Sequence, residues 1–417
     1  MKKKLLIYAH YYIPDVASTG QILKELAEGM LDAFEITVVC VVPSYSGKVA
    51  EEYRTKLFYR EEINGVNIIR IRVPEFSKSN KTSRIKNILA YFIGAMVVTL
   101  KVGKMDFVFS ISQPPILGGL LGFWGKWVKR AKYIYNIQDF NPEQTMAVGY
   151  SKNKLILKVM LWLDKISCRR ADKVIVVGRD MVETLNTRFK GSRIPNHVFI
   201  NNWIDEKEIY PVPDNDEKIR AFKREYGLEK KFVIMYSGNL GLYYDLENLM
   251  YVLKEFRDRE DIIFAFVGEG SIRKELIQIK NKYALSNVVF IPYQNKSDLI
   301  YSLNAGDVHW CINAKGIKGV SVPSKLYGIM AAGKPVLGVL DKGSEARLII
   351  EDANCGYVTI PGDYEGVKEL IEKITSEDER IKLEDKARQG REYLVKYLTK
   401  DVSIKKYVME IMSSGRQ

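Results

Sequence analysis

Short apolar runs alternate with longer helical patterns along most of this chain, and that alternation limits its fold more than any other feature. In the first half, strand patterns lie at Leu5–Ala9, Ile36–Val42, Phe107–Ile111, Tyr133–Ile137 and Lys173–Val177, and helical patterns lie at Gln21–Ala33, Ile116–Arg130 and Leu155–Arg170. Parallel strands need a crossover connection, usually a helix, so this order predicts a parallel sheet covered by helices.

The alternation pauses at residues 201–216, where two prolines and several charged residues indicate an interdomain linker. It then restarts, with strands expected at Phe232–Ser237, Ile262–Val267, Val288–Ile291 and Val308–Ile312, separated by helices at Leu246–Phe256, Ile272–Tyr283 and Ser297–Asn304. We expect an α/β protein with two Rossmann-like parallel-sheet domains, 1–205 and 206–395, that face a cleft. Residues 375–417 predict helices, the last of which (about 396–417) packs back on the first domain.

The charge of the chain predicts an anionic partner. Its 417 residues carry a formal charge of +13, and 47% hydrophobic with 28% charged residues is typical of an ordered globular protein. The sequence has no nucleic-acid-binding motif, so we expect a phosphorylated substrate or an anionic membrane instead. The basic clusters all lie in the first half, at Lys2–Lys4, at Lys78, Lys81, Arg84 and Lys86, at Lys126, Lys129, Arg130 and Lys132, and from Lys152 to Arg170.

Cysteine, histidine and apolar patterns bear on metal binding and location. The four cysteines have no metal-ligand spacing and predict buried thiols in a reducing compartment, and His197 and His309 are isolated, so no metal site is expected. The N-terminus does not resemble a signal peptide. The longest apolar run, Ile88–Leu100, is shorter than the roughly 20 residues that span a bilayer, which favours a soluble or membrane-surface protein.

Residues 321–340 contain the most informative local signal. Pro323 and Ser324 predict a helix start with Ser324 as the N-cap, and Gly333 predicts its end. Lys325 then falls in the first turn, where the helix dipole disfavours a cation. A lysine beside a helix N-terminus makes a good seat for phosphate, although a surface lysine in water is the alternative.

Loops at predicted strand ends supply further candidates. Small residues 17–20, ending in Gly20, precede the first helix, and Gly238 and Gly268 follow two strands of the second half. Exposed backbone N–H groups at such loops approach anions closely, while an ordinary turn is the alternative at each. His10 also ends a strand, and for it capping or packing is favoured over proton transfer.

Two carboxylates at strand or helix ends are candidates for contacts with hydroxyl groups. Asp139 follows a strand of the first half and could accept a hydroxyl hydrogen, or serve only as loop structure. Glu345 begins a predicted helix and could bind sugar or ribose hydroxyls, or simply suit the helix N-terminus electrostatically.

Taken together, the motifs resemble glycosyltransferase family 4, of the two-Rossmann GT-B architecture. They are YSGNLG, VGEG, NVVFIPY, PSKLYGIMAAGKPVLG and CGYVTIPGD in the second half, and ASTGQ, SQPP, IQDFNPE and NNWID in the first. The nearest branch is bacterial surface-polysaccharide assembly, of the fucosamine-transferase and colanic-acid type. The resemblance implies retaining, metal-independent transfer of a hexosyl or aminohexosyl group from a nucleotide-diphosphate sugar. It further implies a lipid-linked acceptor and a cytoplasmic enzyme at the inner face of the plasma membrane, with no cofactor.

The resemblance also assigns roles to residues. It implies donor contacts at Gly20, Gly238, Asn239, Gly268, Tyr293, Ser324, Lys325 and Glu345, an acceptor side at His10, Asp139 and Glu143, and catalytic roles for Lys325 and Asp139. Two features depart from the family. Val320 and Gly328 stand where many members have the two glutamates of an E-x7-E motif, and Asn239 stands where an arginine is usual. We expect Lys325 and Glu345 to substitute for the missing groups.

Two other functional classes remain open at this point. One is a catalytically inactive sugar-nucleotide-binding protein at the membrane, which Val320 and Gly328 favour slightly. The other is a nucleotide-sugar epimerase of similar architecture, which would leave the basic, apolar first half unexplained. Release of free nucleoside diphosphate on turnover distinguishes the transferase from the binding protein.

Overall fold

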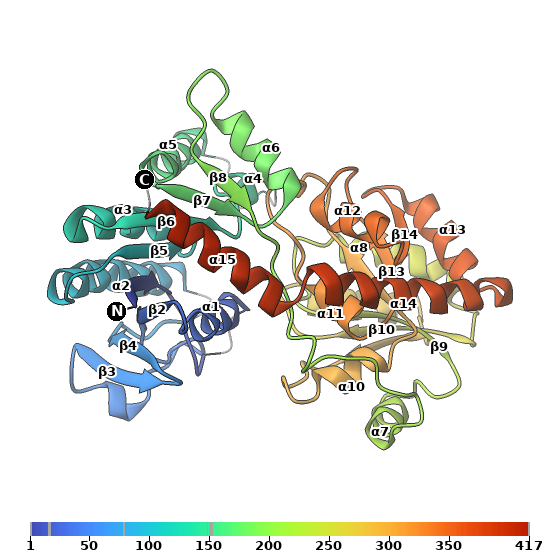
Figure 1. Ribbon diagram of the computed structural model, residues 1–417. Helices are drawn as coiled ribbons and strands as arrows, with labels where there is room; N and C mark the ends of the chain where they lie inside the picture. The colour runs from blue at the N-terminus through green and yellow to red at the C-terminus, as the bar shows by residue number, and fades with distance from the viewer. Residues whose placement is uncertain (1, 16–17, 78–79, 148, 150–152, 416–417) are drawn as a thin grey trace. The chain divides into compact units, whose positions relative to one another are not determined.

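The computed structural model describes residues 2–15, 18–77, 80–147, 149 and 153–415, and they form two compact α/β units (Figure 1). Unit 1 comprises residues 1–177, 181–201 and 401–417, and unit 2 comprises residues 178–180 and 202–400. The division after Asn201 lies within the predicted linker, four residues before the predicted boundary.

Unit 1 is built on an eight-stranded sheet with the order β3-β4-β2-β1-β5-β6-β7-β8. All neighbouring strands are parallel except β3 and β4. The strands are β1 (Lys3–Tyr8), β2 (Phe34–Val41), β3 (Phe58–Ile63), β4 (Val66–Ile71), β5 (Phe107–Ile111), β6 (Lys132–Ile137), β7 (Lys173–Val176) and β8 (His197–Phe199).

The antiparallel hairpin β3–β4 was not among the predicted elements. Its two-residue turn is Asn64-Gly65, and both residues have positive φ, +53° and +80°. That combination is the type I′ turn that joins antiparallel strands without splaying them. The Asn-Gly dipeptide is the sequence signal that identifies it.

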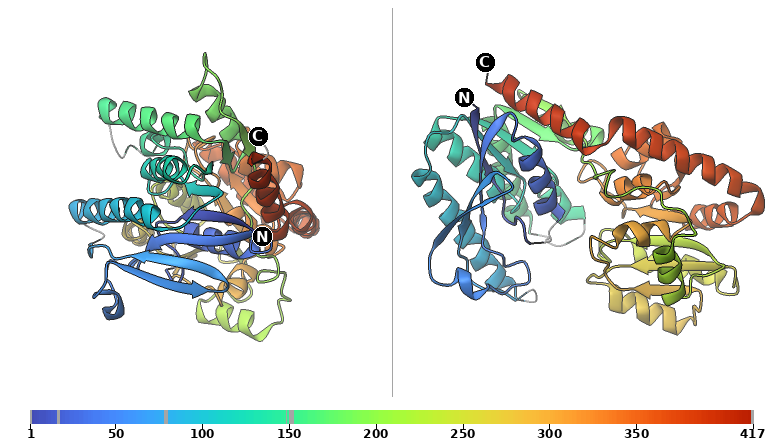
Figure 2. Two further views of the ribbon diagram at one scale, coloured as in Figure 1. Left: turned by 60° about the vertical axis from the view of Figure 1, so that its left-hand side comes forward. Right: turned by 60° about the horizontal axis from the view of Figure 1, so that its bottom comes forward.

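Helices cover both faces of the unit 1 sheet (Figure 2). Their bounds are α1 (Ser18–Gly29), α2 (Lys81–Lys101), α3 (Leu117–Lys129), α4 (Glu143–Ala147), α5 (Lys154–Arg170), α6 (Arg179–Arg188) and α15 (Lys400–Ser414), with a 3-10 turn at Glu51–Tyr53. Along β5, Val108 and Ser110 face α3, whereas Phe107 and Phe109 face α15. Because alternate side chains of a strand point to opposite faces, α3 and α15 cover opposite sides of the sheet.

The last helix of unit 1 follows unit 2 in the chain. Tyr407 of α15 accepts a hydrogen bond from the Asn136 side chain at 3.0 Å, and Ile404 packs on Gly29 of α1. The structure therefore places α15 in unit 1, on which the sequence predicts that a final helix packs. The two helices α14 and α15 lie within the residues for which helices were predicted.

Helix α2 is longer than the apolar run Ile88–Leu100 from which its ability to span a bilayer was judged in the sequence. It has 21 residues, and among the described residues it alone is long and apolar enough to cross a bilayer, judged by length and composition. Core helices of soluble proteins pass the same test. Tyr91 and Ala95 are buried, and α2 packs against β2, β4 and α3. The other face of α2 is exposed.

Unit 2 has a six-stranded, wholly parallel sheet in the order β11-β10-β9-β12-β13-β14. Its strands are β9 (Phe232–Ser237), β10 (Ile262–Val267), β11 (Val288–Ile291), β12 (Val308–Ile312), β13 (Val336–Val339) and β14 (Gly356–Thr359). Its helices are α7 (Glu217–Glu225), α8 (Leu246–Leu253), α9 (Arg273–Lys282), α10 (Leu299–Asn304), α11 (Lys325–Ala331), α12 (Glu345–Asp352), α13 (Tyr364–Ile374) and α14 (Arg380–Tyr397), with 3-10 turns at Lys254–Phe256 and Glu377–Glu379. The prediction of two parallel-sheet α/β domains is confirmed, and all four cysteines are free and buried.

Candidate functional site

In unit 2, the loops that leave β9 and β10 are joined by backbone hydrogen bonds. The Gly238 N–H donates to Val267 O at 2.9 Å, and the Leu240 N–H donates to Glu269 O at 2.9 Å. Gly268 has φ +134°, and a Cβ there would lie 2.1 Å from Gly238 O. Only glycine fits such a close approach of two backbones. The predicted glycines Gly238 and Gly268 thus lie together at the carboxyl edge of the sheet.

Lys325 joins this pair of loops. It is the first residue of α11, as predicted, and its Cε lies 2.9 Å from where a Cβ on Gly238 would be. Its ammonium lies over two aromatic rings, 3.5 Å from the ring centre of Tyr244 and 4.7 Å from that of Tyr236. The alternative of a surface lysine pointing into water is therefore wrong.

The predicted cap of α11 needs a correction. Ser324 occupies the N-cap position, but its backbone is helical and its side chain makes no capping hydrogen bond. Ser324 is exposed, so its hydroxyl is not engaged in holding the helix. The predicted helix end is confirmed, since α11 stops at Ala331 and Gly333 follows with φ +62°.

The surroundings of Lys325 lower its affinity for a proton. Burial among the rings lowers the pKa of Lys325 to about 7, and the Cys311 thiol opposes that shift. Among the described residues, no carboxylate forms an ion pair with it. A cation held away from water without a carboxylate favours the arrival of an anion, which would restore its charge.

Glu345 has a protein partner. It is the first residue of α12 and only 1% exposed, and its Oε2 accepts hydrogen bonds from the Arg179 N–H at 2.8 Å and from Arg179 Nε at 2.9 Å. Arg179 also bonds Asp352 at 2.8 Å through Nη1. Sequence reasoning did not find Arg179. The buried carboxylate of Glu345 is thus paired with the partly exposed Arg179, and its contact with a sugar stays a prediction.

The remaining donor-side positions differ in exposure. Tyr293, just after β11, is 59% exposed, and Asn239 is exposed on the β9 loop. Val320 is buried, and a Cβ on Gly328 would touch only the apolar side chains of Leu303 and Ile204. A carboxylate at position 328 would therefore be buried against apolar side chains.

In unit 1, Asp139 lies where β5, β6 and α1 end or begin. Its N–H donates to Ser112 Oγ at 3.2 Å, and its carboxylate accepts a hydrogen bond from the Gln113 side chain. Gln113 Oε1 in turn accepts from Thr19 Oγ1 at 3.0 Å. Burial raises the pKa of Asp139 to about 6, and the bond from Gln113 opposes that shift. The arrangement is a carboxylate at the carboxyl edge of the sheet, as predicted.

His10 and Gly20 lie at the same edge. The His10 ring is 8% exposed and packs 4.9 Å from the Tyr91 ring and 4.2 Å from the Tyr11 ring, and none of the residues that the structure describes forms a hydrogen bond with its Nε2. Burial lowers the pKa of His10 to about 4, so the ring is neutral, and the packing alternative fits it. Gly20 is buried in the first turn of α1; Ala17 and the Ser18 side chain lie outside the described residues.

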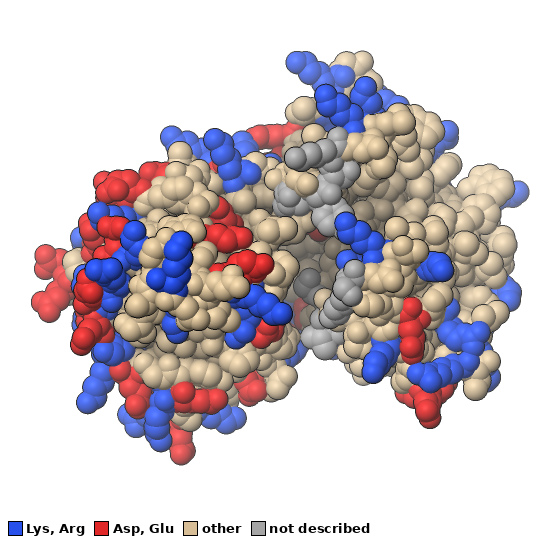
Figure 3. All heavy atoms as spheres, turned by 180° about the vertical axis from the view of Figure 1, so that it is seen from behind, with Lys and Arg blue, Asp and Glu red and all other residues tan. Residues whose placement is uncertain are grey.

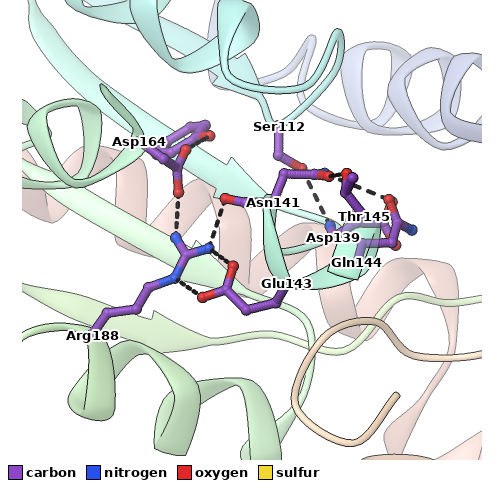
Figure 4. A network of polar contacts seen from close by, with 9 residues as sticks. Ser112, Asp139, Asn141, Glu143, Gln144, Thr145, Asp164 and Arg188 are labelled. Atoms are coloured by element: carbon purple, nitrogen blue, oxygen red, sulfur yellow. Dashed lines mark hydrogen bonds and ion pairs between the residues drawn. The ribbon is translucent and has the colours of Figure 1, made fainter. Parts of the chain in front are cut away.

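Glu143 belongs to a network that sequence reasoning missed (Figure 4). Arg188, 8% exposed, donates through Nε to Glu143 Oε1 at 2.7 Å, through Nη1 to Asp164, and through Nη2 to Asn141 O at 2.8 Å. Asp164 also accepts from the Tyr135 hydroxyl at 2.6 Å. Glu143 is therefore part of an ion pair with Arg188, and its role on the acceptor side stays a prediction. The network fixes the 138–143 loop that carries Asp139.

No group of three or more His, Cys, Asp or Glu residues is placed to hold a metal ion in the part of the chain that the structure describes.

Comparison with known proteins identifies the family. The family model "Glycosyl transferase 4-like domain" matches residues 19–203, and the model "Glycosyl transferases group 1" matches residues 218–392. The probable glycosyltransferase WbjE of Pseudomonas aeruginosa is 29% identical over 323 residues, which cover 73% of this chain and 76% of that protein. The putative colanic acid biosynthesis glycosyl transferase WcaI of Escherichia coli K12 is 23% identical over 428 residues, 98% of this chain and 99% of that protein.

A solved structure supports the fold. HepE of Anabaena in complex with UDP and glucose superposes with a TM-score of 0.72 at 16% identity, covering 99% of this chain and all of that one. The fold is the GT-B type, with two parallel-sheet α/β domains. The chain belongs to the glycosyltransferases, with a 4-like domain in its first half and a group 1 domain in its second.

Proposed function

We propose that this glycosyltransferase moves a hexosyl or aminohexosyl group, with retention, from a nucleotide-diphosphate sugar to a lipid-linked glycan in surface-polysaccharide assembly. It would act in the cytoplasm, at the inner face of the plasma membrane. The name of WcaI refers to colanic acid biosynthesis, and HepE was solved with UDP and glucose. One observation carries the proposal: the Lys325 ammonium lies on two tyrosine rings, without a carboxylate among the described residues, beside the joined loops of Gly238 and Gly268.

The donor diphosphate is proposed to bind unit 2 at the ammonium of Lys325. The strand-end loops there offer backbone that approaches a phosphate closely. Binding of the anion supplies the counter-charge that Lys325 lacks. The ammonium then leaves the face of a tyrosine ring and contacts a phosphate oxygen. Exposed Tyr293 and Asn239 are proposed to contact the nucleoside and sugar.

The proposed chemistry breaks the bond between the anomeric carbon and the diphosphate oxygen. The acceptor hydroxyl oxygen bonds to the same face of that carbon, and its proton passes to the departing phosphate. Negative charge grows on the diphosphate, where a preorganised cation stabilises the transition state. In this proposal Lys325 supplies that cation without a metal, and Asp139 of unit 1 orients the acceptor by accepting a hydrogen bond from its hydroxyl.

A turnover assay tests this function against its alternatives. Purified protein is incubated with a panel of nucleotide sugars and a lipid extract as acceptor, and free nucleoside diphosphate and glycosylated lipid are measured. The transferase should release diphosphate in step with lipid product. Binding of donor with no release would instead assign an inactive sugar-nucleotide-binding protein. Conversion of the donor sugar without acceptor would assign an epimerase.

Binding of the diphosphate should take up a proton above pH 7. The free protein loses the Lys325 proton as the pH rises through its pKa of about 7, while bound phosphate favours the charged form. At pH 8 the phosphate itself is already ionised, so titration calorimetry in buffers of different ionisation enthalpy should report close to one proton taken up by the protein. Lys325→Met should abolish that uptake. Identical heats in all buffers for the wild type would contradict the assignment of Lys325.

Asp139→Asn should lower transfer about 10²-fold or more while the Kd for nucleotide sugar stays unchanged. The wild-type rate should also fall as the pH drops through about 6, because a raised pKa means that the Asp139 carboxylate takes a proton there. The variant should lack this acid limb. Acceptor kcat/KM against pH, together with donor titrations, measures both effects.

Asp106→Asn is the matched control for this experiment. Asp106 precedes β5, at the opposite edge of the same sheet, where it accepts a hydrogen bond from the Lys4 N–H. Its variant should transfer at the wild-type rate. Equal loss of transfer and donor binding in Asp139→Asn would remove Asp139 from the acceptor side.

A further inference from the structure

Three helices of unit 1 lie side by side in one layer over the sheet, with α3 between α2 and α5 (Figures 1 and 2). We call the outer surface of α2, α3 and α5 the three-helix face. It exposes large apolar side chains where a surface usually carries polar ones. Trp127 is 69% exposed and Trp162 is 61% exposed, and the other exposed large apolar residues of the three helices are Ile85, Leu89, Ile93, Leu100, Leu155, Ile156 and Val159.

The spacing of these residues shows that they form stripes. Residues 85, 89 and 93 recur every four positions along α2, and residues 155, 159 and 162 follow one another at spacings of four and three along α5. Such spacing puts side chains on one face of a helix. The buried residues of α2, including Tyr91 and Ala95, occupy the opposite side, against the sheet. Contiguous exposed apolar surface of this kind marks an interaction site.

The charged residues of these three helices are almost all cations. Its helices carry eleven cations, namely Lys81, Arg84, Lys86, Lys101, Lys126, Lys129, Lys154, Lys158, Lys165, Arg169 and Arg170. They contain a single acid, Asp164, which is 3% exposed and bonded to Arg188. At the frequency of the whole chain, 51 acids in 417 residues, about six would be expected in helices of this combined length. Figure 3 shows lysine and arginine side chains interspersed with uncharged surface on unit 1.

The combination of apolar stripes, exposed tryptophans and a large excess of cations over acids fits one partner best. Protein interfaces are depleted in lysine, and nucleic acid offers its phosphates but no apolar layer for isoleucine and leucine. An anionic bilayer accepts both, because its headgroups pair with lysine and arginine while tryptophan and aliphatic side chains enter the headgroup boundary. We propose that the three-helix face docks on an anionic membrane. The proposal rests on the proposed function in one respect: a lipid-linked acceptor gives the enzyme its reason to bind a membrane.

The test is flotation with phosphatidylcholine vesicles, with and without phosphatidylglycerol. Wild-type protein should float with the anionic vesicles only, and its binding should weaken as salt rises. The charge variant Lys86→Gln, Lys154→Gln, Lys158→Gln removes exposed cations that form no ion pair or hydrogen bond with the residues the structure describes. Lys126 and Lys129 are left intact, because Lys126 pairs with Asp172 and Lys129 bonds Val102 O. Each cation contributes about fivefold to partitioning, so the variant should bind about 10²-fold more weakly.

A second variant tests the apolar component. Trp127→Gln with Trp162→Gln should weaken binding to anionic vesicles without changing its salt dependence. The matched control Lys230→Gln, Lys274→Gln, Lys405→Gln neutralises three exposed lysines outside the face and should float like the wild type. Equal flotation with neutral and anionic vesicles, or no flotation at all, would overturn the proposal. So would salt-sensitive binding to RNA by a protein that ignores vesicles.

The outcome can be separated from that of the proposed function. Lys325→Met should float like the wild type although it is expected to lose turnover. The charge variant should keep its thermal shift with nucleoside diphosphate and its transfer to acceptor dispersed in detergent. If the wild type transfers sugar but ignores vesicles, the docking face is wrong and the function stands. If it floats but never releases diphosphate, the docking stands and the function is wrong.

Discussion

Lys325→Met should lower turnover about 10²–10³-fold, the loss seen when one preorganised electrostatic contact to a transition state is removed. The ammonium sits on Tyr236 and Tyr244 beside Gly238, where the departing diphosphate is proposed to lie. Methionine fills similar space without charge, so the site keeps its shape. Steady-state assays should show the loss mainly in kcat, because the charge on the diphosphate grows as the bond breaks. A turnover within threefold of the wild type would rule out this role.

The stability of this variant separates chemistry from folding. The folded protein loses the Lys325 proton at about pH 7 and the unfolded chain loses it near 10.5, so burying the charge costs stability most at low pH. Lys325→Met should therefore be at least as stable as the wild type at pH 7, with the gap closing as the pH rises toward 10.5. Lys334→Met is the matched control. Lys334 precedes β13, at the other end of the strands, and burial also lowers its pKa, yet this variant should keep normal turnover.

Arg188→Met should lower the free energy of unfolding of unit 1 by about 3–5 kcal/mol. Arg188 is the cation that balances Asp164, and its loss leaves a buried carboxylate whose one remaining hydrogen bond from the described residues comes from the Tyr135 hydroxyl. The guanidinium also packs on Phe140 at 4.2 Å and bonds Asn141 O, so the loop that carries Asp139 loosens too. Urea unfolding followed by tryptophan fluorescence measures the change. The loss should be smaller in acid, where Asp164 takes a proton.

A double variant tests whether the unpaired charge of Asp164 causes the loss of stability in Arg188→Met. Adding Asp164→Asn removes the charge that Arg188→Met leaves unpaired, so the double variant should recover part of the lost stability. Exposed Arg193→Met is the control and should change stability by less than about 0.5 kcal/mol. Additive losses in the double variant would show that the network holds unit 1 together by packing alone.

Much of the fold follows from local pattern. The bounds of β5, β9, β10, β11 and β12 agree with the predicted strands, because each is a short apolar run bounded by polar residues. The β3–β4 hairpin was not predicted, because the exposed polar residues of β3 obscure the alternation of apolar and polar side chains that identifies a strand. The Asn64-Gly65 turn is the sequence signal that indicates the hairpin. The sequence also predicted the position of α11. The absence of a capping hydrogen bond from the Ser324 side chain depends on its helical backbone angles, which the sequence does not reveal.

The sequence predicted where the residues of the candidate site lie better than it predicted which side chains surround them. Strand ends and a helix start located Lys325 and Asp139, but the tyrosine rings around Lys325 come from β9 and the loop after it, about 80–90 residues earlier in the chain. The partners of Glu143 and Glu345, Arg188 and Arg179, carry no motif. The Glu143–Arg188 pair depends on how α4 and α6 pack within unit 1, and the Glu345–Arg179 pair is a contact within unit 2, so both are properties of tertiary packing.

The placement of α15 has a consequence for how the protein is made. Asn136 and Phe109 of the unit 1 sheet, and Gly29 of α1, are covered by Tyr407 and Ile404, which leave the ribosome only after all of unit 2. During synthesis one side of the first domain therefore stays uncovered for about 200 residues, roughly 10–40 s at ordinary elongation rates. The second domain completes its own sheet in that interval. The order of folding is thus the reverse of the order of translation: unit 1 is translated first, and it is the last of the two units to complete its fold.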